Sequence, residues 1–324
     1  MEFSNITLVT GATGFIGRHL VKRLADAGVK VRATGLSTGD RSFFAELGVE
    51  FIPSDLTVPA TLPPLFQGDV DRVFHLGAIC NFSTSYKNLY PINVKGVEYI
   101  TKLAMAKGIK RFVHVCSTSV YGPYRGKPFN EESPRCPQDN YGRSKRDGED
   151  VVFGQMNKGL PVTILRPSTV YGPGCNDGAG KVFSGPSSIT GIPGHGKQRL
   201  SNVRAEDVAG AAVFLSQLDE AQNQIYNISD DSNPMLEEAL ALAAETFGTR
   251  VPRSHIPLAL VKTFACIDGF ISGLRGKIPV LEYDAVRYLG DDYIVDSAKL
   301  KQTGYQLLYP DFKTSIRQQG KSQV

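Results

Sequence analysis

Tyr141 and Lys145 stand four residues apart in the stretch YGRSK (141–145). If this stretch is helical, both side chains leave the same helix face about one turn apart. A lysine ammonium in that position stabilises a phenolate and lowers the pKa of a tyrosine, which is about 10 in an unperturbed phenol. Such a pair could move a proton near neutral pH. Ordinary solvated helix surfaces show the same spacing, so the rest of the chain has to decide between the two interpretations.

The glycine-rich turn TGATGFIG (10–17) is the second feature with a chemical meaning, and it follows the apolar run ITLVT (6–10). Gly11 permits a tight turn, Gly14 lets a pyrophosphate approach the backbone, and Gly17 lets the next helix pack against the strand. The N-terminus of that helix offers unpaired N–H groups and a partial positive charge. The turn therefore predicts a dinucleotide-binding site.

The end of the second expected strand bears on which dinucleotide is bound. An acidic residue there would bind a ribose 2′-hydroxyl, whereas an arginine would suit a 2′-phosphate. Gly35 or Leu36 stands at the deciding position, and the nearest cations are Arg32 and Arg41. NAD and NADP therefore both stay open.

Short apolar runs alternate with helical patterns through the first half of the chain. The expected strands are residues 6–10, 29–34, 49–52, 71–77, 111–117 and 162–167, and the expected helices include 15–28, 94–108 and the one carrying Tyr141. This alternation predicts an α/β fold, a parallel sheet with helices on both faces. Ligands bind such sheets beyond the carboxyl ends of the strands, where the chemical motifs fall.

The alternation breaks down after about residue 170. Two segments rich in glycine, proline and serine come first, followed by a helix at 206–218, a strand at 224–228 and helices near 234–247 and 257–274. We expect residues 1–170 to form a dinucleotide-binding domain. Residues 171–324 should form mostly a smaller, partly interleaved substrate-binding lobe, from which some segments return to the first domain.

The composition narrows the class of protein. The 324 residues are 41% hydrophobic and 21% charged, and the net charge of +4 is spread along the chain, which gives nucleic-acid binding little support. Five dispersed cysteines favour a reduced, metal-free protein, and no secretory signal is visible, so a cytoplasmic location is expected.

Lys262 and Asp268 interrupt the most apolar segment, 256–274, which argues against a membrane-spanning helix. A buried amphipathic helix is favoured over a membrane-surface helix, which leaves peripheral membrane contact as the alternative.

With these motifs in order, the chain resembles the extended short-chain dehydrogenase/reductase family, most strongly from residue 6 to about 215. The motifs that carry the resemblance are TGATGFIG (10–17), Asp55-Leu56, HLGA (75–78), NVKG (93–96), CSTSVYG (116–122), YGRSK (141–145), RPSTVYGPG (166–174) and RAEDVAGA (204–211). The resemblance implies a Rossmann-type doubly wound parallel sheet and an NAD or NADP cofactor. Family members often form homodimers through the helices that carry Asn93 and Tyr141.

The resemblance also implies roles for individual residues. The catalytic set would be Ser117, Tyr141 and Lys145, with Thr118 as an alternative to Ser117 and Asn93 as a weaker candidate. The cofactor would contact Gly11, Thr13, Gly14, Phe15, Ile16, Gly17, Asp55, Leu56, Leu76, Gly77, Ala78, Tyr141, Lys145, Pro167 and Thr169. Asp55 could equally be a helix N-cap.

Two departures from the family pattern bear on the substrate. Nucleotide-sugar enzymes often carry asparagine where Thr169 stands. They also tend to have an Arg-Asp-Phe-like stretch before the second helix of the small lobe, and here the arginine, Arg199, is displaced from that position. The apolar segments 256–274 and 278–289 are similar to the steroid-dehydrogenase branch. The expected activity is interconversion of a secondary alcohol and a ketone on an apolar small molecule, such as a 3β-hydroxysterol or its 3-ketone.

Two other functions stay open. One is a nucleotide-sugar 4-epimerase; a dehydratase is less favoured, because Thr118 and Ser119 do not supply its usual acidic pair. The other is a non-catalytic NAD(P)-binding regulatory protein, against which the complete set of Ser117, Tyr141 and Lys145 argues.

Overall fold

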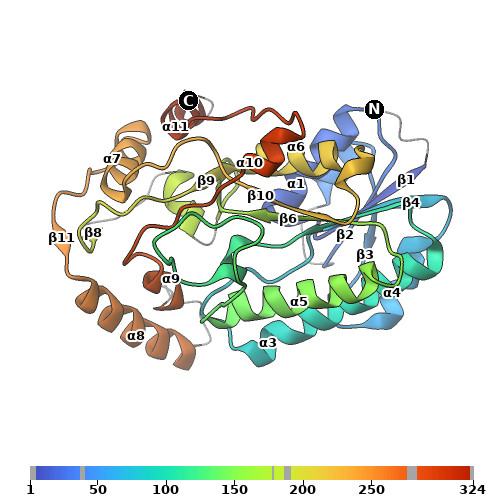
Figure 1. Ribbon diagram of the computed structural model, residues 1–324, viewed down its shortest axis with the longest axis horizontal. Coiled ribbons are helices and arrows are strands. Elements are labelled where there is room, and N and C mark those ends of the chain that lie inside the picture. Colours follow the sequence, from blue (N-terminus) through green and yellow to red (C-terminus); the bar gives the residue numbers. More distant parts are fainter. Residues whose placement is uncertain (1–4, 37–40, 177–178, 186–190, 276–282, 322–324) are drawn as a thin grey trace.

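The computed structural model describes residues 5–36, 41–176, 179–185, 191–275 and 283–321 (Figure 1). Within these residues, one seven-stranded sheet has the order β10-β6-β5-β4-β1-β2-β3. Its strands are β1 (Ile6–Thr10), β2 (Val31–Gly35), β3 (Glu50–Pro53), β4 (Val70–His75), β5 (Arg111–Val115), β6 (Val162–Pro167) and β10 (Gln224–Ile228). All of the pairings are parallel. The α/β prediction is confirmed.

Helices cover both faces of the sheet (Figure 1). On one face, α1 (Phe15–Asp26) and α6 (Ala205–Leu215) share an apolar core with β1 and β5. On the other face, α4 (Val97–Lys107) and α5 (Asn140–Met156) share a core with alternate residues of the same strands. Both faces are buried because a parallel sheet is wrapped by its crossover helices, which is why its strands are apolar along their whole length.

The remaining elements follow the chain. The short helices are α2 (Ser42–Glu46), α3 (Tyr86–Tyr90), α9 (Tyr283–Arg287) and α10 (Ala298–Gln302), and the longer ones are α7 (Leu236–Thr246), α8 (Leu258–Leu274) and α11 (Phe312–Lys321). Two small sheets pair β7 (Thr169–Tyr171) with β9 (Asn202–Arg204), and β8 (Ile192–Pro193) with β11 (His255–Ile256). Residues 94–96 of the predicted helix 94–108 belong to a π-helix, Pro91–Gly96. Residues 278–282 of the predicted apolar segment 278–289 lie outside the described residues.

Helix α8 corrects the prediction of a buried amphipathic helix in the segment 256–274. Its inner face is narrow, since Val261 and Ala265 pack only on a small cluster that includes Val286 of α9. Large apolar side chains are exposed along the rest of it, namely Leu260, Phe264, Ile267, Phe270, Ile271 and Leu274. The sequence pattern was compatible with burial because apolar residues lie on more than one side of this helix, so the pattern does not reveal which side is covered. None of the described helices is long and apolar enough to cross a membrane.

Candidate active site

Tyr141 and Lys145 lie in the first two turns of α5. The helix begins beyond Asp139, whose carboxylate accepts a hydrogen bond of 2.6 Å from the backbone N–H of Gly142. Both side chains are buried, with 6% of Tyr141 and 5% of Lys145 exposed. The Lys145 Nζ donates to the carbonyl oxygen of Val115, at the end of β5, over 3.1 Å. The predicted pair therefore sits at the carboxyl edge of the sheet.

Ser117 lies two residues beyond the end of β5 and completes the predicted set. Burial raises the pKa of the Tyr141 phenol well above its ordinary value, and a hydrogen bond with the Ser117 side chain offsets only part of this rise. In the absence of cofactor the Tyr141 phenol is thus held protonated. The alternative, Thr118, lies one residue further on, and its carbonyl accepts a 2.7 Å hydrogen bond from the Tyr293 hydroxyl.

A loop after β4 forms a wall beside the Tyr141 hydroxyl. The Cys80 thiol forms a hydrogen bond with this hydroxyl, which further raises the pKa of Tyr141. The Phe82 ring lies 4.9 Å from the Tyr141 ring, centroid to centroid, and 5.8 Å from the Tyr288 ring. No motif in the sequence marked Cys80 or Phe82, and Tyr288 stood out only as part of the apolar segment 278–289, because the proximity of all three to Tyr141 arises only in the folded chain.

Asn93 holds this loop in place. Its side-chain oxygen accepts from the backbone N–H of Ile79 at 2.8 Å, and its amide nitrogen donates to the Ile79 carbonyl at 3.0 Å. The same nitrogen donates to the Ser144 hydroxyl of α5 at 2.9 Å. Asn93 therefore ties the loop to the helix that carries Tyr141, as a positioning residue.

The glycine turn 10–17 has the shape of a phosphate-binding cradle. Gly14 is the N-cap of α1 and has no side chain to bond the first N–H groups of the helix. A Cβ added at Gly14 would lie 3.2 Å from the Gly11 carbonyl oxygen, and one added at Gly17 would lie 2.1 Å from it. This space and these N–H groups fit the pyrophosphate of a dinucleotide.

The predicted loop after β4 lies against this turn. A Cβ at Gly11 would be 2.6 Å from the backbone nitrogen of Gly77, and the Leu76 N–H donates to Thr10 over 3.2 Å. The Leu56 side chain fills the space beside Gly77, where an added Cβ would lie 2.8 Å from its Cδ1. The carboxyl edge thus brings together the glycine turn and the segments at 56 and 76–78.

The other predicted cofactor residues lie around the same edge. Thr13 touches the end of β2, since a Cβ at Gly35 would be 2.6 Å from its Oγ1. Pro167 ends β6 and Thr169 begins β7. The Asp55 carboxylate caps its own turn, accepting from the Thr57 N–H and hydroxyl, both at 2.8 Å. Phe15 and Ile16 open α1, and Ala78 follows Gly77 in the loop.

Arg32 is engaged away from any 2′-phosphate. Its guanidinium pairs with Glu50 at 2.8 Å and donates to the carbonyl oxygens of Leu65 and Gln67 at 3.0 and 2.6 Å. Of the two cations nearest to the end of β2, Arg41 lies over the Phe51 ring at 5.5 Å. Arg32 therefore gives no support for NADP over NAD.

A buried ion pair anchors the catalytic helix one turn beyond Lys145. Glu149 of α5 and Arg166 of β6 have side chains that are 0% and 2% exposed and form a salt bridge. The Cys116 thiol donates to Glu149 at 3.1 Å, and Arg166 donates to the Tyr121 hydroxyl at 2.8 Å. Glu149 continues the four-residue spacing of Tyr141 and Lys145, which is the sequence signal that could have revealed it.

Two buried histidines lie close enough to Lys145 to interact with its charge. His75 of β4 and His114 of β5 stack with ring centroids 5.6 Å apart. Burial, together with the positive charge of Lys145, lowers the pKa of His75 to about 3 and that of His114 well below its ordinary value. Both rings are therefore neutral near pH 7 and add no second positive charge beside Lys145.

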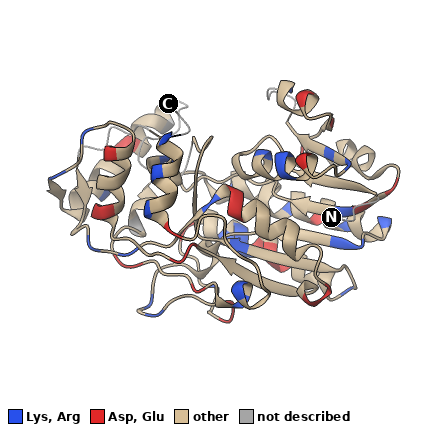
Figure 2. Ribbon diagram, turned by 90° about the horizontal axis from the view of Figure 1, so that it is seen from above, with Lys and Arg blue, Asp and Glu red and all other residues tan. Residues whose placement is uncertain are grey.

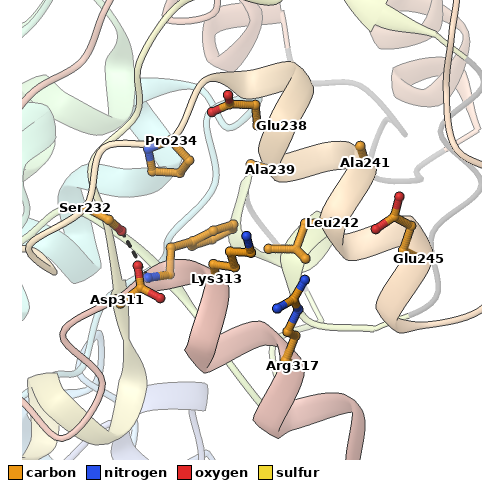
Figure 3. A pocket seen from close by; sticks show the side chains of 11 residues that line it. Ser232, Pro234, Glu238, Ala239, Ala241, Leu242, Glu245, Asp311, Lys313 and Arg317 are labelled. Carbon is orange, nitrogen blue, oxygen red and sulfur yellow. Dashed lines mark hydrogen bonds between the residues drawn. The ribbon is translucent and has the colours of Figure 1, made fainter.

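A surface groove between α7 and α11 lies apart from this site. Carboxylates of α7 and cations of α11 line it from opposite sides (Figure 3). Over the ribbon as a whole, cations and carboxylates are intermixed (Figure 2). Neither helix carries a member of the Ser117, Tyr141 and Lys145 set, so the groove is not a candidate for the catalytic centre.

We expect Gly17→Ala to weaken NAD(H) binding by at least about tenfold, equal to ~1.4 kcal/mol. The new Cβ would lie 2.1 Å from the Gly11 carbonyl oxygen, so the turn has to move. Isothermal titration calorimetry on the folded variant measures the Kd. Gly154→Ala is the matched control, because a Cβ there meets nothing within 4 Å. Unchanged affinity in the Gly17 variant would remove this turn from the cofactor site.

Comparisons with known proteins agree with the geometry. The profile of the "NAD dependent epimerase/dehydratase family" matches residues 7–229. "Sterol demethylase protein B" of Methylococcus capsulatus is 33% identical over 91% of this chain and 92% of its own, and "UDP-glucose 4-epimerase" of Vibrio cholerae is 28% identical over 84% and 86%.

The solved structure of UDP-glucose 4-epimerase from Thermotoga maritima has the same fold. Its TM-score is 0.78 at 21% identity, and the match covers 98% of this chain and 97% of that one. The chain therefore belongs to the NAD dependent epimerase/dehydratase family, and it is an enzyme of the extended short-chain type that uses a nicotinamide dinucleotide.

Proposed function

We propose that the protein is an NAD(P)-dependent dehydrogenase that interconverts a secondary alcohol and a ketone on an apolar substrate, best fitted by a 3β-hydroxysterol or its 3-ketone. The observation that carries the proposal is the aromatic wall that packs against the ring of Tyr141. Phe82 packs on Tyr141, and Tyr288 packs on Phe82. A flat apolar ring system suits such a wall better than a charged diphosphate does.

The proposed roles follow from the positions of the three side chains. In ketone reduction, the Tyr141 hydroxyl donates its proton to the ketone oxygen, and the Ser117 hydroxyl stabilises the charge that develops there. Lys145 holds its ammonium beside the site through Val115 and would bind the nicotinamide ribose hydroxyls. The bound nicotinamide supplies or accepts the hydride. In alcohol oxidation the same hydroxyl group of Tyr141, as a phenolate, takes the proton.

The pairing of Arg166 and Arg204 within the protein also favours an apolar substrate. Arg166 is paired with Glu149, and Arg204 is 3% exposed in its side chain and paired with Glu206. Arg199 is exposed, and its backbone N–H donates to Asp292 at 2.7 Å. Arg166 and Arg204 are thus neutralised within the protein, which weakens the case for a diphosphate.

The similarity to Sterol demethylase protein B adds the sterol class to this proposal. A nucleotide-sugar 4-epimerase is the second candidate, favoured by the similarity to the Vibrio cholerae UDP-glucose 4-epimerase. The two activities share the initial oxidation, so the substrate decides between them.

A substrate panel separates the two candidates. We expect purified protein with NAD⁺ or NADP⁺ to form reduced cofactor with 3β-hydroxysterols and to leave UDP-glucose and UDP-galactose unchanged. Because epimerisation gives no net cofactor change, the sugar products are analysed by chromatography. Interconversion of the two UDP-sugars, with no turnover of any sterol, would contradict the proposed substrate.

We also propose the domain division and dimer expected from the sequence. Residues 1–170 would bind the cofactor, and residues 171–324 would supply most of the substrate lobe. The dimer would use α4 and α5, whose partly buried apolar side chains include Tyr99, Leu103 and Phe153.

A further inference from the structure

Helix α8 presents an apolar face that no described part of the chain covers. Leu260, Phe264, Ile267, Ile271 and Leu274 follow one another at intervals of three or four residues, so they share one side of the helix. Phe270 stands beside them and is 70% exposed, and Leu274 is 75% exposed. Scattered apolar side chains are normal on a protein surface, but a continuous stripe of this kind marks an interaction site.

Another side of α8 packs on the protein. Val261 and Ala265 are buried, with 7% and 0% exposed, and pack with Val286 of α9. The Ser272 hydroxyl donates to the Asp268 carboxylate at 3.2 Å. The exposed stripe therefore belongs to a helix that is held in place, with its apolar side turned outward.

The charges around the stripe favour an anionic surface. Along the sequence from 250 to 275 the cations are Arg250, Arg253, Lys262 and Arg275, and the carboxylate is Asp268, which is bonded to Ser272. Helix α9, which packs on α8, adds the carboxylate of Asp284, so the cations remain in excess. Arg250, Arg253 and Arg275 are exposed. A symmetric contact with a second copy of this chain would bring this cationic region against itself, which is unfavourable. Anionic lipid headgroups would neutralise the cations, while the acyl boundary would cover the apolar side chains.

We propose that α8 docks the protein on the surface of an anionic membrane, lying in the interface with Phe264, Phe270 and their apolar neighbours inserted. The helix lies beside α9 (Figure 1), and α9 is followed by Tyr288, whose hydroxyl donates to Asp139 at the start of the catalytic helix. A docked bilayer would therefore adjoin the lobe that contacts the catalytic helix. The proposal concerns only the surface of α8 and does not depend on the identity of the substrate.

Flotation of the full chain with vesicles tests the proposal, without substrate or cofactor. We expect the protein to float with phosphatidylcholine vesicles containing phosphatidylglycerol, and more weakly with phosphatidylcholine alone. The double variant Phe264→Ser/Phe270→Ser should lose at least about tenfold in partitioning, since binding scales with inserted apolar area. Leu308→Ser is the matched control, because Leu308 is 56% exposed but lies outside α8.

The folded state of each variant is checked by circular dichroism and thermal unfolding, which these exposed positions should leave unchanged. Absence of flotation for the wild type would overturn the proposal, as would equal flotation of the double variant. Sedimentation equilibrium gives the remaining test. Concentration-dependent association that disappears in the double variant, without vesicle binding, would assign the stripe to a second copy of the chain instead.

Discussion

Replacing Tyr141 by phenylalanine should reduce turnover by about 10²–10⁴-fold, the usual contribution of a positioned general acid or base. The substitution removes one hydroxyl from a side chain that is 6% exposed and hydrogen-bonded to Ser117 and Cys80. The ring and its contact with Phe82 are retained, so cofactor affinity should stay within a few-fold of the wild type. Steady-state rates and calorimetric Kd values measure the two effects separately.

The pH dependence adds a second measurement on the same residue. Burial raises the pKa of Tyr141, so the phenol is protonated near neutral pH and can act as an acid at once. Ketone reduction therefore needs no prior loss of a proton, whereas alcohol oxidation should become faster as the pH rises and the phenolate forms. A Tyr141→Phe variant should lose this rise in any residual activity.

A matched control is Tyr86→Phe. The Tyr86 hydroxyl is bonded to Asp147 at 2.5 Å, and Tyr86 lies on α3 rather than on the catalytic helix. Its loss should leave the rate near that of the wild type. Substantial turnover in Tyr141→Phe, at a rate like that of Tyr86→Phe, would refute the role assigned to Tyr141.

Replacing Glu149 by methionine should lower the free energy of unfolding by about 3–5 kcal/mol, because it leaves the buried Arg166 guanidinium without its counter-charge. Both side chains are almost fully buried. Urea unfolding, followed by circular dichroism, measures the loss. Glu149 lies one turn beyond Lys145 on α5, so we also expect a lower kcat under conditions where the variant is folded.

Two further variants serve as controls for the stability loss expected in Glu149→Met. The double variant Glu149→Met/Arg166→Met removes both charges, and it should recover part of the stability lost in the single variant. Lys22→Ala breaks an exposed pair with Asp26, whose side chains are 59% and 55% exposed, and it should cost only about 0.3–0.5 kcal/mol. A loss for Glu149→Met no greater than that for Lys22→Ala would show that the pair does not anchor α5.

Local patterns in the sequence predicted the sheet and the glycine turn correctly. The strands 6–10, 162–167 and 224–228 coincide with β1, β6 and β10. Short apolar runs between turn residues determine such strands, and all the residues that form the glycine turn lie within the eight residues TGATGFIG. These features depend on neighbours in the sequence, which is why they can be read without a structure.

Features that depend on distant partners could not be predicted in this way. From the sequence Arg32 was a candidate to bind a 2′-phosphate, but in the folded chain it pairs with Glu50 of β3. Tyr288 reaches Asp139 across 149 residues of sequence. The covered face of α8 depends on Val286, and its own apolar pattern is the same whether it is buried or exposed.

The most direct test of the central claim follows the hydride itself. A 3β-hydroxysterol deuterated at the carbon that bears the hydroxyl is incubated with the protein and oxidised cofactor, and both products are analysed by mass spectrometry. We expect deuterium in the reduced nicotinamide and a sterol ketone in equal amount, and at least about 10²-fold less of both products with Tyr141→Phe. The proposal would be contradicted by no transfer from any sterol, together with a UDP-sugar deuterated at C4 that gives up its deuterium and takes it back.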